Sequence, residues 1–536
     1  MANTVAEAFA ATAAAHGERP FLVVPARADR DWHPDGIAFS YGRAAGEIAG
    51  LRERYRQAGF GHGHRVALLL ENRPEFFFHY LALNALGVSI VPVNPDYRHD
   101  EMCYLLDHSE AELAVVLPHR LADVHKVAAD RTRPLSVVDA LALPTELPSP
   151  TAQRRAEPAS LETECALLYT SGTTGRPKGC MLSNFYFLNA ARNYLDLGGL
   201  AEFRRGEERF YNPLPLFHMN HLAITATAAM LTANALVLPE RFSPTRWWPE
   251  VSATGATIIH YLGIVAPMLL NQQPGPADRQ HQVRFGIGAG IEPQLHRAFE
   301  ERFGFPMIEV WGMTETGRIF ADSREPRAID TRAFGRPFAG FEARVVDGED
   351  REVPGGTEGE LVVRHTEKAP RHGFFSGYLK NEAATEEAWR GGWFHTGDVV
   401  RQDASGMLHF VDRKKHIIRR SGENIAAAEV EAVLQGHEAV AQVAVLAVPD
   451  ELREEEVLAC VVPMPGVAPS IALAELLFDH CNARLAYFKA PGWMLFLDKL
   501  PTTGTQKVQK TQIFSLGEDP RGRAGSIDLR ARKRRG

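Results

Sequence analysis

Short apolar runs of two lengths alternate along the first part of the chain. Residues 65–70 ("RVALLL"), 88–94 ("VSIVPVN") and 113–118 ("LAVVLP") have the length of buried strands. Residues 75–86 ("EFFFHYLALNAL") have the length of a buried helix. Alternation of this kind predicts an α/β domain whose sheet is largely parallel.

The same pattern returns further along the chain. Residues 234–239, 256–263 and 283–290 predict strands that run into turns. Ligands bind at the carboxyl ends of strands in open α/β sheets, so these turns are candidate binding positions. Between the two regions, residues 131–160 contain five prolines and little periodicity, which predicts a connector.

The longest uncharged run lies between Arg209 and Glu240. It contains residues 222–239 ("LAITATAAMLTANALVLP"), which are numerous enough to suggest a membrane helix. Its threonines, Asn234 and many alanines make it only mildly apolar. A buried helix followed by a strand is therefore the prediction, and no membrane span is expected.

From about residue 334 to 411 the pattern changes to short alternating strands. Residues 342–347, 358–364 and 406–412 are separated by Gly- and Asp-containing turns, which predict a small antiparallel barrel or sheet. Residues 413–515 then follow the order helix, strand, strand, helix, which is enough for an independent small α+β domain.

Composition narrows the functional classes. The 536 residues carry a net charge of −7, so no general attraction to nucleic acid is expected. The five cysteines are scattered without a CxxC spacing, which argues against a disulfide framework or a zinc site and fits a cytoplasmic protein. The N-terminus lacks a basic segment and a sustained apolar core, so no signal peptide is expected.

A glycine-rich loop at residues 169–179 ("YTSGTTGRPKG") is the first candidate for chemistry. Its glycines bring backbone N–H groups close to a ligand, its hydroxyls can donate to phosphate oxygens, and Lys178 adds a positive charge. Gly179 follows the lysine, so this is not the GxxxxGK[ST] phosphate loop of kinases and GTPases. A solvated turn is the alternative for a loop of this composition.

Further motifs follow in a fixed order. They are "PLFHMN" (215–220), "WGMTE" (311–315), "WFHTGDVV" (393–400), "DRKKHIIRRSGEN" (412–424) and "LPTTGTQKVQK" (500–510). Together with the glycine-rich loop, they resemble the adenylate-forming superfamily of acyl-CoA synthetases, peptide-synthetase adenylation domains and firefly-type luciferases. The resemblance covers about residues 20–515 and is closest to the branch of crotonobetaine/carnitine–CoA ligases.

The resemblance implies an α/β fold. A large N-terminal domain (1–412) would contain two α/β sheet subdomains plus a small β-barrel-like subdomain, followed by a small mobile α+β C-terminal lid domain (413–515). The basic tail, 516–536, is expected to be disordered. The implied activity joins a carboxylic acid to coenzyme A through an acyl-adenylate, with ATP, Mg²⁺ and coenzyme A as the cofactors.

The resemblance also implies a nucleotide site. The β- and γ-phosphates of ATP would lie in the loop formed by Thr170, Ser171, Gly172, Thr173, Thr174, Gly175 and Lys178. Thr314 would hydrogen-bond the α-phosphate, and Glu315 would ligate Mg²⁺ unless it is a surface carboxylate. The other ATP- and AMP-binding residues would be Gly288, Ala289, Gly290, Trp311, Gly312 and Met313, with the backbone of residues 288–290 close to the adenine and the acyl group. The Trp311 ring either stacks on adenine or packs in the core.

Ribose and catalytic groups come from later motifs. Asp398, reinforced by Arg413, would accept both ribose hydroxyls. Lys507 would bridge the acyl carboxylate and the α-phosphate. The family usually has "TGK" there and this chain has "GTQK", so Lys510 is the alternative assignment. Lys415 falls at the hinge of the family, where the next residue is a histidine instead of the usual acidic residue.

The thioester step would use a different set of groups. Ser421, Gly422 and Glu423 would line the pantetheine tunnel, with His218 as a gate or positioning group. The acyl pocket would be built from His218, Met219, Asn220, Tyr261, Gly263 and Gly288. Small and polar residues in these segments favour a short or polar acid over a long fatty chain.

Two other functions remain open. An adenylation enzyme that loads a carrier-protein thiol uses the same first step, although the absence of an adjoining carrier segment favours coenzyme A. A nucleotide-binding sensor without chemistry is the third interpretation, and the joint presence of Glu315, Asp398 and Lys507 argues against it. A homodimer is compatible with the sequence, which does not fix the oligomeric state.

Overall fold

The computed structural model describes residues 2–170, 176–263, 265–291, 293–413, 417–501, 510, 513–515 and 518–534. The chain forms two compact units. The first contains Met1–Pro95, Leu106–Tyr169 and Gly179–Lys414, and the second contains Asp96–Leu105, Thr170–Lys178 and Lys415–Gly536.

One sheet of the first unit has the strand order β18-β8-β7-β4-β3-β5-β6. Its strands are β3 (Arg65–Leu69), β4 (Ser89–Pro92), β5 (Leu113–Val116), β6 (Ser136–Asp139), β7 (Glu164–Thr170), β8 (Lys178–Ser183) and β18 (Gly377–Tyr378). Its helical connections are α2 (Tyr41–Gln57), α3 (Pro74–Asn84), α4 (His99–Ser109) and α5 (Leu121–Asp130). The parallel pairing of β3 with β4 and β5 confirms the predicted alternation. The connector at 131–160 contains a strand, β6, that its composition did not predict.

A second sheet has the strand order β14-β13-β12-β11-β9-β10-β1-β2. Its strands are β1 (Pro20–Val24), β2 (Ile37–Ser40), β9 (Arg209–Tyr211), β10 (Ala235–Val237), β11 (Ile258–Leu262), β12 (Phe285–Ala289), β13 (Met307–Gly312) and β14 (Ile319–Ala321). The accompanying helices are α1 (Val5–Ala15), α6 (Asn184–Leu195), α7 (Thr227–Thr232), α8 (Trp247–Thr254), α9 (Val265–Leu270) and α10 (Pro293–Phe303). The three strands predicted at 234–290 all form.

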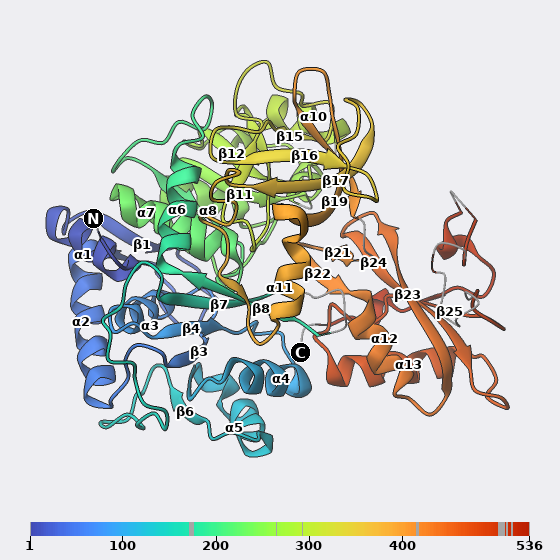
Figure 1. The fold of residues 1–536 in the computed structure, drawn as a ribbon, viewed down its shortest axis with the longest axis horizontal. Helices are drawn as coiled ribbons and strands as arrows, with labels where there is room; N and C mark the ends of the chain where they lie inside the picture. Colours follow the sequence, from blue (N-terminus) through green and yellow to red (C-terminus); the bar gives the residue numbers. More distant parts are fainter. Residues whose placement is uncertain are drawn as a thin grey trace. The chain divides into compact units, whose positions relative to one another are not determined.

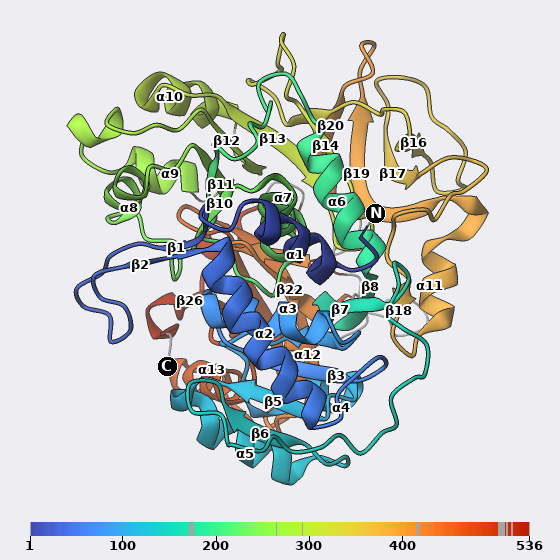
Figure 2. The same cartoon turned by 90° about the vertical axis from the view of Figure 1, so that its left-hand side faces the viewer.

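Helices α1, α3, α6 and α7 share one hydrophobic core with strands of both sheets. Buried side chains of this core include Phe9 on α1, Phe77 on α3, Leu68 on β3 and Ile258 on β11. Figures 1 and 2 show these helices close to both sheets of the first unit. A common apolar layer therefore packs the two sheets against the same set of helices.

The uncharged run at 222–239 is buried, as predicted. A π-helix from Asn220 to Ala226 leads into α7, and β10 follows. No helix in the described ranges has the length and apolar character needed to span a membrane. The sequence did not predict the π-helical turn, a geometry that is often found at functional sites.

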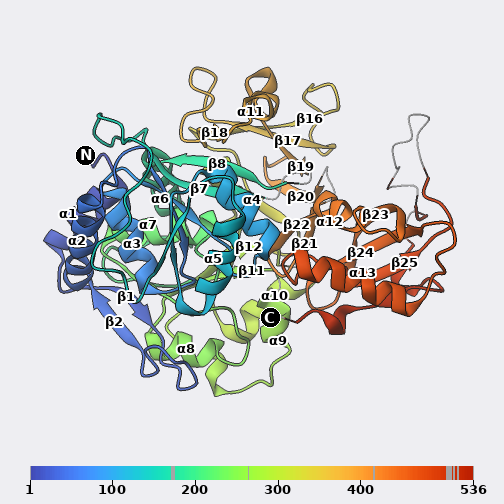
Figure 3. The same ribbon diagram turned by 90° about the horizontal axis from the view of Figure 1, so that it is seen from below.

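The third sheet of the first unit has the order β15-β20-β19-β17-β16 and is antiparallel, as predicted. Its strands are β15 (Ala333–Gly335), β16 (Glu342–Val346), β17 (Glu358–Arg364), β19 (Phe394–Gln402) and β20 (Leu408–Arg413), with α11 (Glu382–Ala388) between β17 and β19 in the chain. Figure 3 shows β16, β17 and β19 side by side.

The C-terminal part of the second unit is an α+β module. It contains β21 (Ile417–Arg420), β22 (Glu423–Ala426), α12 (Ala427–Gln435), β23 (Val440–Asp450), β24 (Glu454–Pro463), α13 (Ile471–Arg484), β25 (Trp493–Phe496) and β26 (Ile527–Asp528). The order α12, β23, β24, α13 confirms the predicted helix, strand, strand, helix. Short 3₁₀ turns lie at Pro118–Arg120, Pro276–Asp278, Arg390–Gly392, Pro520–Gly522 and Arg530–Arg532.

A buried lysine ties an N-terminal segment into the second unit. The Nζ atom of Lys489 donates to Glu101 Oε1 at 2.6 Å and to Glu429 Oε1 at 2.9 Å. All three side chains are almost fully buried. Because removing one partner of a buried ion pair leaves an uncompensated charge, this triad strongly favours the observed pairing.

The expectation of a disordered tail is wrong for the part that the structure describes. Strand β26 pairs antiparallel with β25, and Leu529 is 2% exposed within the hydrophobic core of the module. The basic composition of the tail concealed two apolar positions, Ile527 and Leu529, next to cations with specific acidic partners.

Candidate functional site

The carboxyl ends of β11, β12 and β13 meet at one edge of the second sheet. In this parallel register Tyr261 lies opposite Gly288, and Gly288 lies opposite Glu309. A Cβ atom on Gly288 would lie 2.1 Å from the carbonyl oxygen of Tyr261, so only glycine fits. The predicted segments 261–263, 288–290 and 311–315 are thus adjacent, as their order along the sheet requires.

Glu309 organises this edge, and the sequence analysis did not identify it. Its Oε1 accepts from the Tyr261 hydroxyl at 2.6 Å, and its Oε2 accepts from the Gly290 N–H at 2.8 Å. The Ile291 N–H donates to Oε1 at 3.2 Å. Burial raises the pKa of Glu309 to about 7, although these three donors favour the carboxylate. A charged residue inside an otherwise apolar strand was the available signal.

Trp311 and Asp398 come together from two different sheets. The indole Nε1–H donates to Asp398 Oδ2 at 2.8 Å, and both residues are buried. The Trp311 ring also stacks on Phe320, with ring centroids 5.6 Å apart. Asp398 on β19 lies opposite Arg413 on β20, so the two predicted ribose residues are cross-strand neighbours.

Thr314 and Glu315 occupy the turn after β13. Glu315 is 6% exposed, and its Oε1 accepts from the Tyr378 hydroxyl at 2.9 Å. The carbonyl oxygen of Thr314 accepts from the Tyr186 hydroxyl on α6 at 2.6 Å. The interpretation of Glu315 as a surface carboxylate is therefore wrong. A held carboxylate oxygen is the type of ligand that Mg²⁺ prefers.

The predicted histidine of the acyl site is neutral. His218 lies just before the π-helix, and burial lowers its pKa to about 4. Its imidazole therefore carries no charge near pH 7. Met219, the next residue, is buried, and its sulfur atom lies 3.9 Å from the Tyr186 hydroxyl oxygen.

The π-helix presents a polar network to the interior. The Asn212 side chain donates to Asn220 Oδ1 at 3.1 Å and to Thr225 Oγ1 at 3.0 Å. His260 Nε2 lies 2.9 Å from the Tyr194 hydroxyl and 3.3 Å from Thr225 Oγ1. Polar groups therefore lie behind part of the predicted acyl site, where an alkyl tunnel would need apolar ones.

Two atoms of this region lack hydrogen-bond partners within the described ranges. They are His221 Nε2 and His260 Nδ1, and both are fully buried. The other His221 nitrogen, Nδ1, is hydrogen-bonded to the carbonyl oxygen of Leu214. An unsatisfied buried polar atom costs about 1–3 kcal/mol, so a polar ligand group would be stabilised here.

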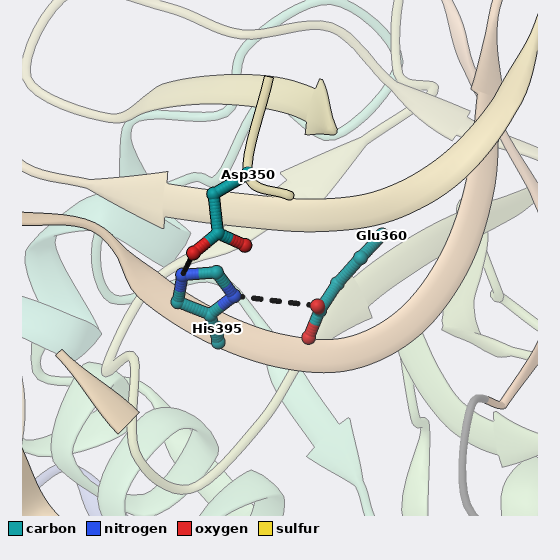
Figure 4. A group of neighbouring side chains, drawn as sticks. All are labelled: Asp350, Glu360 and His395. Atoms are coloured by element: carbon teal, nitrogen blue, oxygen red, sulfur yellow. Dashed lines mark hydrogen bonds and ion pairs between the residues drawn. The ribbon is translucent and has the colours of Figure 1, made fainter. Parts of the chain in front are cut away.

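Three side chains in and beside the antiparallel sheet resemble a metal site. Figure 4 shows Asp350, Glu360 and His395, whose ligand-type atoms lie within 4.8 Å of one another. Arg390 lies among them, with its Nη2 2.7 Å from His395 Nδ1 and its Nε donating to Asp350 Oδ2 at 2.9 Å. A guanidinium can only donate, so this cluster is an ion-pair network rather than a cation site.

The same network positions the loop that carries Asp398. Glu360 Oε1 accepts from the Gly397 N–H at 3.1 Å, and the Thr396 hydroxyl donates to the Leu361 carbonyl at 2.6 Å. Gly397 has a φ of 71°, which favours glycine. Glu360 and its partners thus fix the turn one residue before Asp398.

Several predicted residues lie outside the described residues. They are Ser171, Gly172, Thr173, Thr174, Gly175, Lys415 and Lys507. Thr170 ends β7 and Lys178 begins β8, on either side of the glycine-rich loop. Lys510, the alternative to Lys507, pairs with Glu431 at 2.6 Å.

The predicted tunnel residues form a tight turn in the second unit. Ser421 and Gly422 have φ values of 51° and 85°, and they link β21 to β22. The Ser421 N–H donates to the Arg453 carbonyl at 3.1 Å. The structure therefore gives Ser421, Gly422 and Glu423 one defined backbone conformation.

Comparisons with known proteins identify the family of the chain. The model of the AMP-binding enzyme family matches residues 9–379, and that of the AMP-binding enzyme C-terminal domain matches residues 429–507. The chain is 30% identical to the sulfoacetate–CoA ligase of Cupriavidus necator, over 96% of this chain and 98% of that relative. It is 30% identical to the crotonobetaine/carnitine–CoA ligase of Proteus mirabilis, over 89% and 93% of the two chains.

Solved structures show the same fold. A malonyl-CoA ligase with methylmalonyl-CoA and AMP bound has a TM-score of 0.73 and 26% identity, over 90% of this chain and 97% of that chain. A double mutant of the o-succinylbenzoate–CoA synthetase from Bacillus subtilis has a TM-score of 0.80 and 24% identity, over 94% and 98% of the chains.

The buried Glu309 predicts an unusual pH dependence of stability. Its pKa in the folded protein is about 7, above the ordinary value of 4.5. The folded state therefore binds more protons than the unfolded state between these pH values, and this stabilisation is lost as pH rises through 7. Relative to Glu309→Gln, the wild-type protein should lose on the order of 3 kcal/mol between pH 4.5 and 8.

Chemical denaturation of the two proteins at several pH values checks this prediction. Glu53→Gln is the control, because Arg56 lowers the pKa of the exposed Glu53 to about 2, so that this carboxylate stays charged in the folded protein over the whole range. A pH-independent difference between Glu309→Gln and wild type would contradict the assigned titration.

Proposed function

Because the chain belongs to the AMP-binding enzyme family and is an AMP-forming acyl-CoA ligase, we propose that two separate sets of side chains serve its two half-reactions. In the first half-reaction, an acid and ATP give an acyl-adenylate and pyrophosphate. In the second, coenzyme A takes the acyl group and AMP leaves. A cytoplasmic location, a homodimer and the domain limits given above stay predictions.

The first set binds ATP for adenylation. An oxygen of the acid attacks the α-phosphorus, and the bond to pyrophosphate breaks. The loop from Thr170 to Lys178 would hold the leaving phosphates, and the Thr314 hydroxyl would donate to the α-phosphate. Lys507 would neutralise the two anions as they approach each other.

Asp398 is the residue that we expect to bind the ribose. Its Oδ2 is fixed by the Trp311 indole at 2.8 Å, and the preceding turn is fixed by Glu360. Because both the carboxylate and the turn before it are already fixed, Asp398 loses little conformational entropy when it accepts the ribose hydroxyls. The neighbouring Arg413 would add a donor to the same region.

Mg²⁺ is the expected metal partner of ATP. Glu315 fits this role because its buried carboxylate is oriented by the Tyr378 hydroxyl at 2.9 Å. When bound, Mg²⁺ would neutralise charge on the phosphate oxygens. The chain itself contributes the position of the carboxylate.

The second set serves the formation of the thioester. The thiol sulfur attacks the acyl carbonyl carbon, the thiol proton passes to solvent and AMP leaves. Ser421, Gly422 and Glu423 would line the path of the pantetheine. His218 would position the acyl group, since a pKa of about 4 makes its imidazole a weak base.

We further propose that the acid is short and polar. The supporting observation is the buried polar wall around the π-helix, including the unpaired His221 Nε2 and His260 Nδ1 atoms. The names of the relatives point the same way, because sulfoacetate, crotonobetaine and carnitine are short acids with a second charged group.

Removing the Trp311 donor should weaken ATP binding selectively. Trp311→Phe keeps an aromatic ring but deletes a hydrogen bond to a charged acceptor, which is worth about 1.5–3 kcal/mol. The KM for ATP should rise by ~10- to 100-fold while kcat changes less. Trp389→Phe, at another buried indole, is the control, and an unchanged KM for ATP would contradict the role given to Trp311.

Lys507→Ala should separate the half-reactions. We expect loss of acyl-adenylate formation with thioester formation from a supplied acyl-adenylate largely intact. Lys510→Ala is the matched control, because Lys510 already pairs with Glu431. Equal loss of both steps in Lys507→Ala, or loss of adenylation only in Lys510→Ala, would show that the lysine is misassigned.

A panel of acids tests the substrate class. Thioester formation should have a kcat/KM at least ~10-fold higher for short polar acids, such as sulfoacetate and crotonobetaine, than for butyrate or decanoate. His260→Phe should reduce this preference. A preference for decanoate in the wild-type enzyme would overturn the proposal of a polar acid.

A further inference from the structure

The C-terminal tail forms an integral part of the α+β module. The family model of the C-terminal domain ends at residue 507, so residues 518–534 lie beyond it. The tail extends the sheet through β26, and the Leu529 N–H donates to the Gly492 carbonyl at 2.8 Å. Arg530 pairs with Asp450 at 3.0 Å. These contacts bring the end of the chain to the edge of the sheet.

A buried cluster of charged side chains joins the last part of the tail to the module. The Nζ atom of Lys533 donates to Glu456 Oε1, and it also donates to the Phe488 carbonyl at 3.1 Å. The other carboxylate oxygen, Oε2, accepts from Arg420 Nε at 2.7 Å. The side chains of Lys533, Glu456 and Arg420 are 1%, 0% and 2% exposed, so water does not screen this cluster.

The carboxylate between the two cations has little freedom. Glu456 packs directly against the backbone of Gly492, where an added Cβ would lie 2.4 Å from the carboxyl carbon. Its Oε1 also accepts from the Val457 N–H at 2.7 Å. Lys533 therefore completes the coordination of one oxygen while Arg420 occupies the other.

Arg420 is the last residue before the turn that holds Ser421 and Gly422. It is paired in register with Glu423 across β21 and β22, on the far side of the turn. The turn requires positive φ values at two successive residues, which disfavours it for Ser421. An anchor at Arg420 therefore helps to hold a strained backbone in place.

We propose that the tail is a positioning element for the thioester half-reaction, in which Lys533 acts through Glu456 and Arg420 to hold the Ser421–Glu423 turn. This inference rests on the proposed assignment of that turn to the pantetheine path. Residues beyond the family domain would then support the thioester half-reaction and not the adenylation half-reaction.

Lys533→Met in the full-length enzyme tests the inference. Thioester formation from a supplied acyl-adenylate should fall by ~10-fold or more, with a higher KM for coenzyme A, because a charged buried hydrogen bond is lost. Acid-dependent pyrophosphate release without coenzyme A should stay within ~2-fold of wild type. Lys533→Arg should recover part of the thioester rate.

Two further variants complete the test. Glu456→Gln, which keeps the shape of the side chain, should reproduce the selective loss even where Lys533→Met folds poorly. Arg532 lies on the same tail and pairs with Asp479 and Glu475 of helix α13, so Arg532→Ala removes two ion pairs of the tail and should leave both steps unchanged.

The alternative results are distinct. Equal loss of both half-reactions with a lower melting temperature in Lys533→Met and Glu456→Gln would overturn the inference, because the tail would then be only a structural support. Unchanged thioester formation in both would overturn it as well. Failure of the proposed function itself would appear differently, as a wild-type enzyme that forms no thioester from any acyl-adenylate.

Discussion

The hydrogen bond from the Trp311 indole to the Asp398 carboxylate joins two sheets of the first unit at the proposed nucleotide site. Trp311 lies near the end of β13 in the sheet that also holds β11 and β12, whereas Asp398 lies in the antiparallel sheet. The turn before Asp398 is fixed separately by Glu360. The geometry of the proposed ribose site therefore depends on how these two sheets are packed, and the shared core of the unit provides that packing.

Much of the fold follows from local pattern. Strands β3, β4 and β5 and helix α3 were predictable because each buries a run of suitable length. The π-helix at Asn220–Ala226 was not, since its sequence is apolar enough for an ordinary helix and the extra residue per turn depends on buried partners such as Asn212. Strand β6 was hidden by the prolines around it.

The same contrast holds for the site. Motif order predicted one site for Trp311 and Asp398, and the Trp311 indole does donate to the Asp398 carboxylate. The roles given to these residues and to Glu315 stay predictions. The sequence analysis did not identify Glu309 because this residue belongs to no motif. Its importance depends on a hydroxyl and two N–H groups supplied from other segments. The structural role of the tail was not predicted for a similar reason. Lys533 is one of several cations near the C-terminus, and only its long-range partner Glu456 distinguishes it.

We infer that acyl-adenylate formation and thioester formation are separate chemical steps performed by different side chains. Exchange of labelled pyrophosphate into ATP, in the presence of the acid and the absence of coenzyme A, reports the first step alone. We expect acid-dependent exchange without coenzyme A. Exchange that requires coenzyme A, or that proceeds equally without any acid, would contradict it.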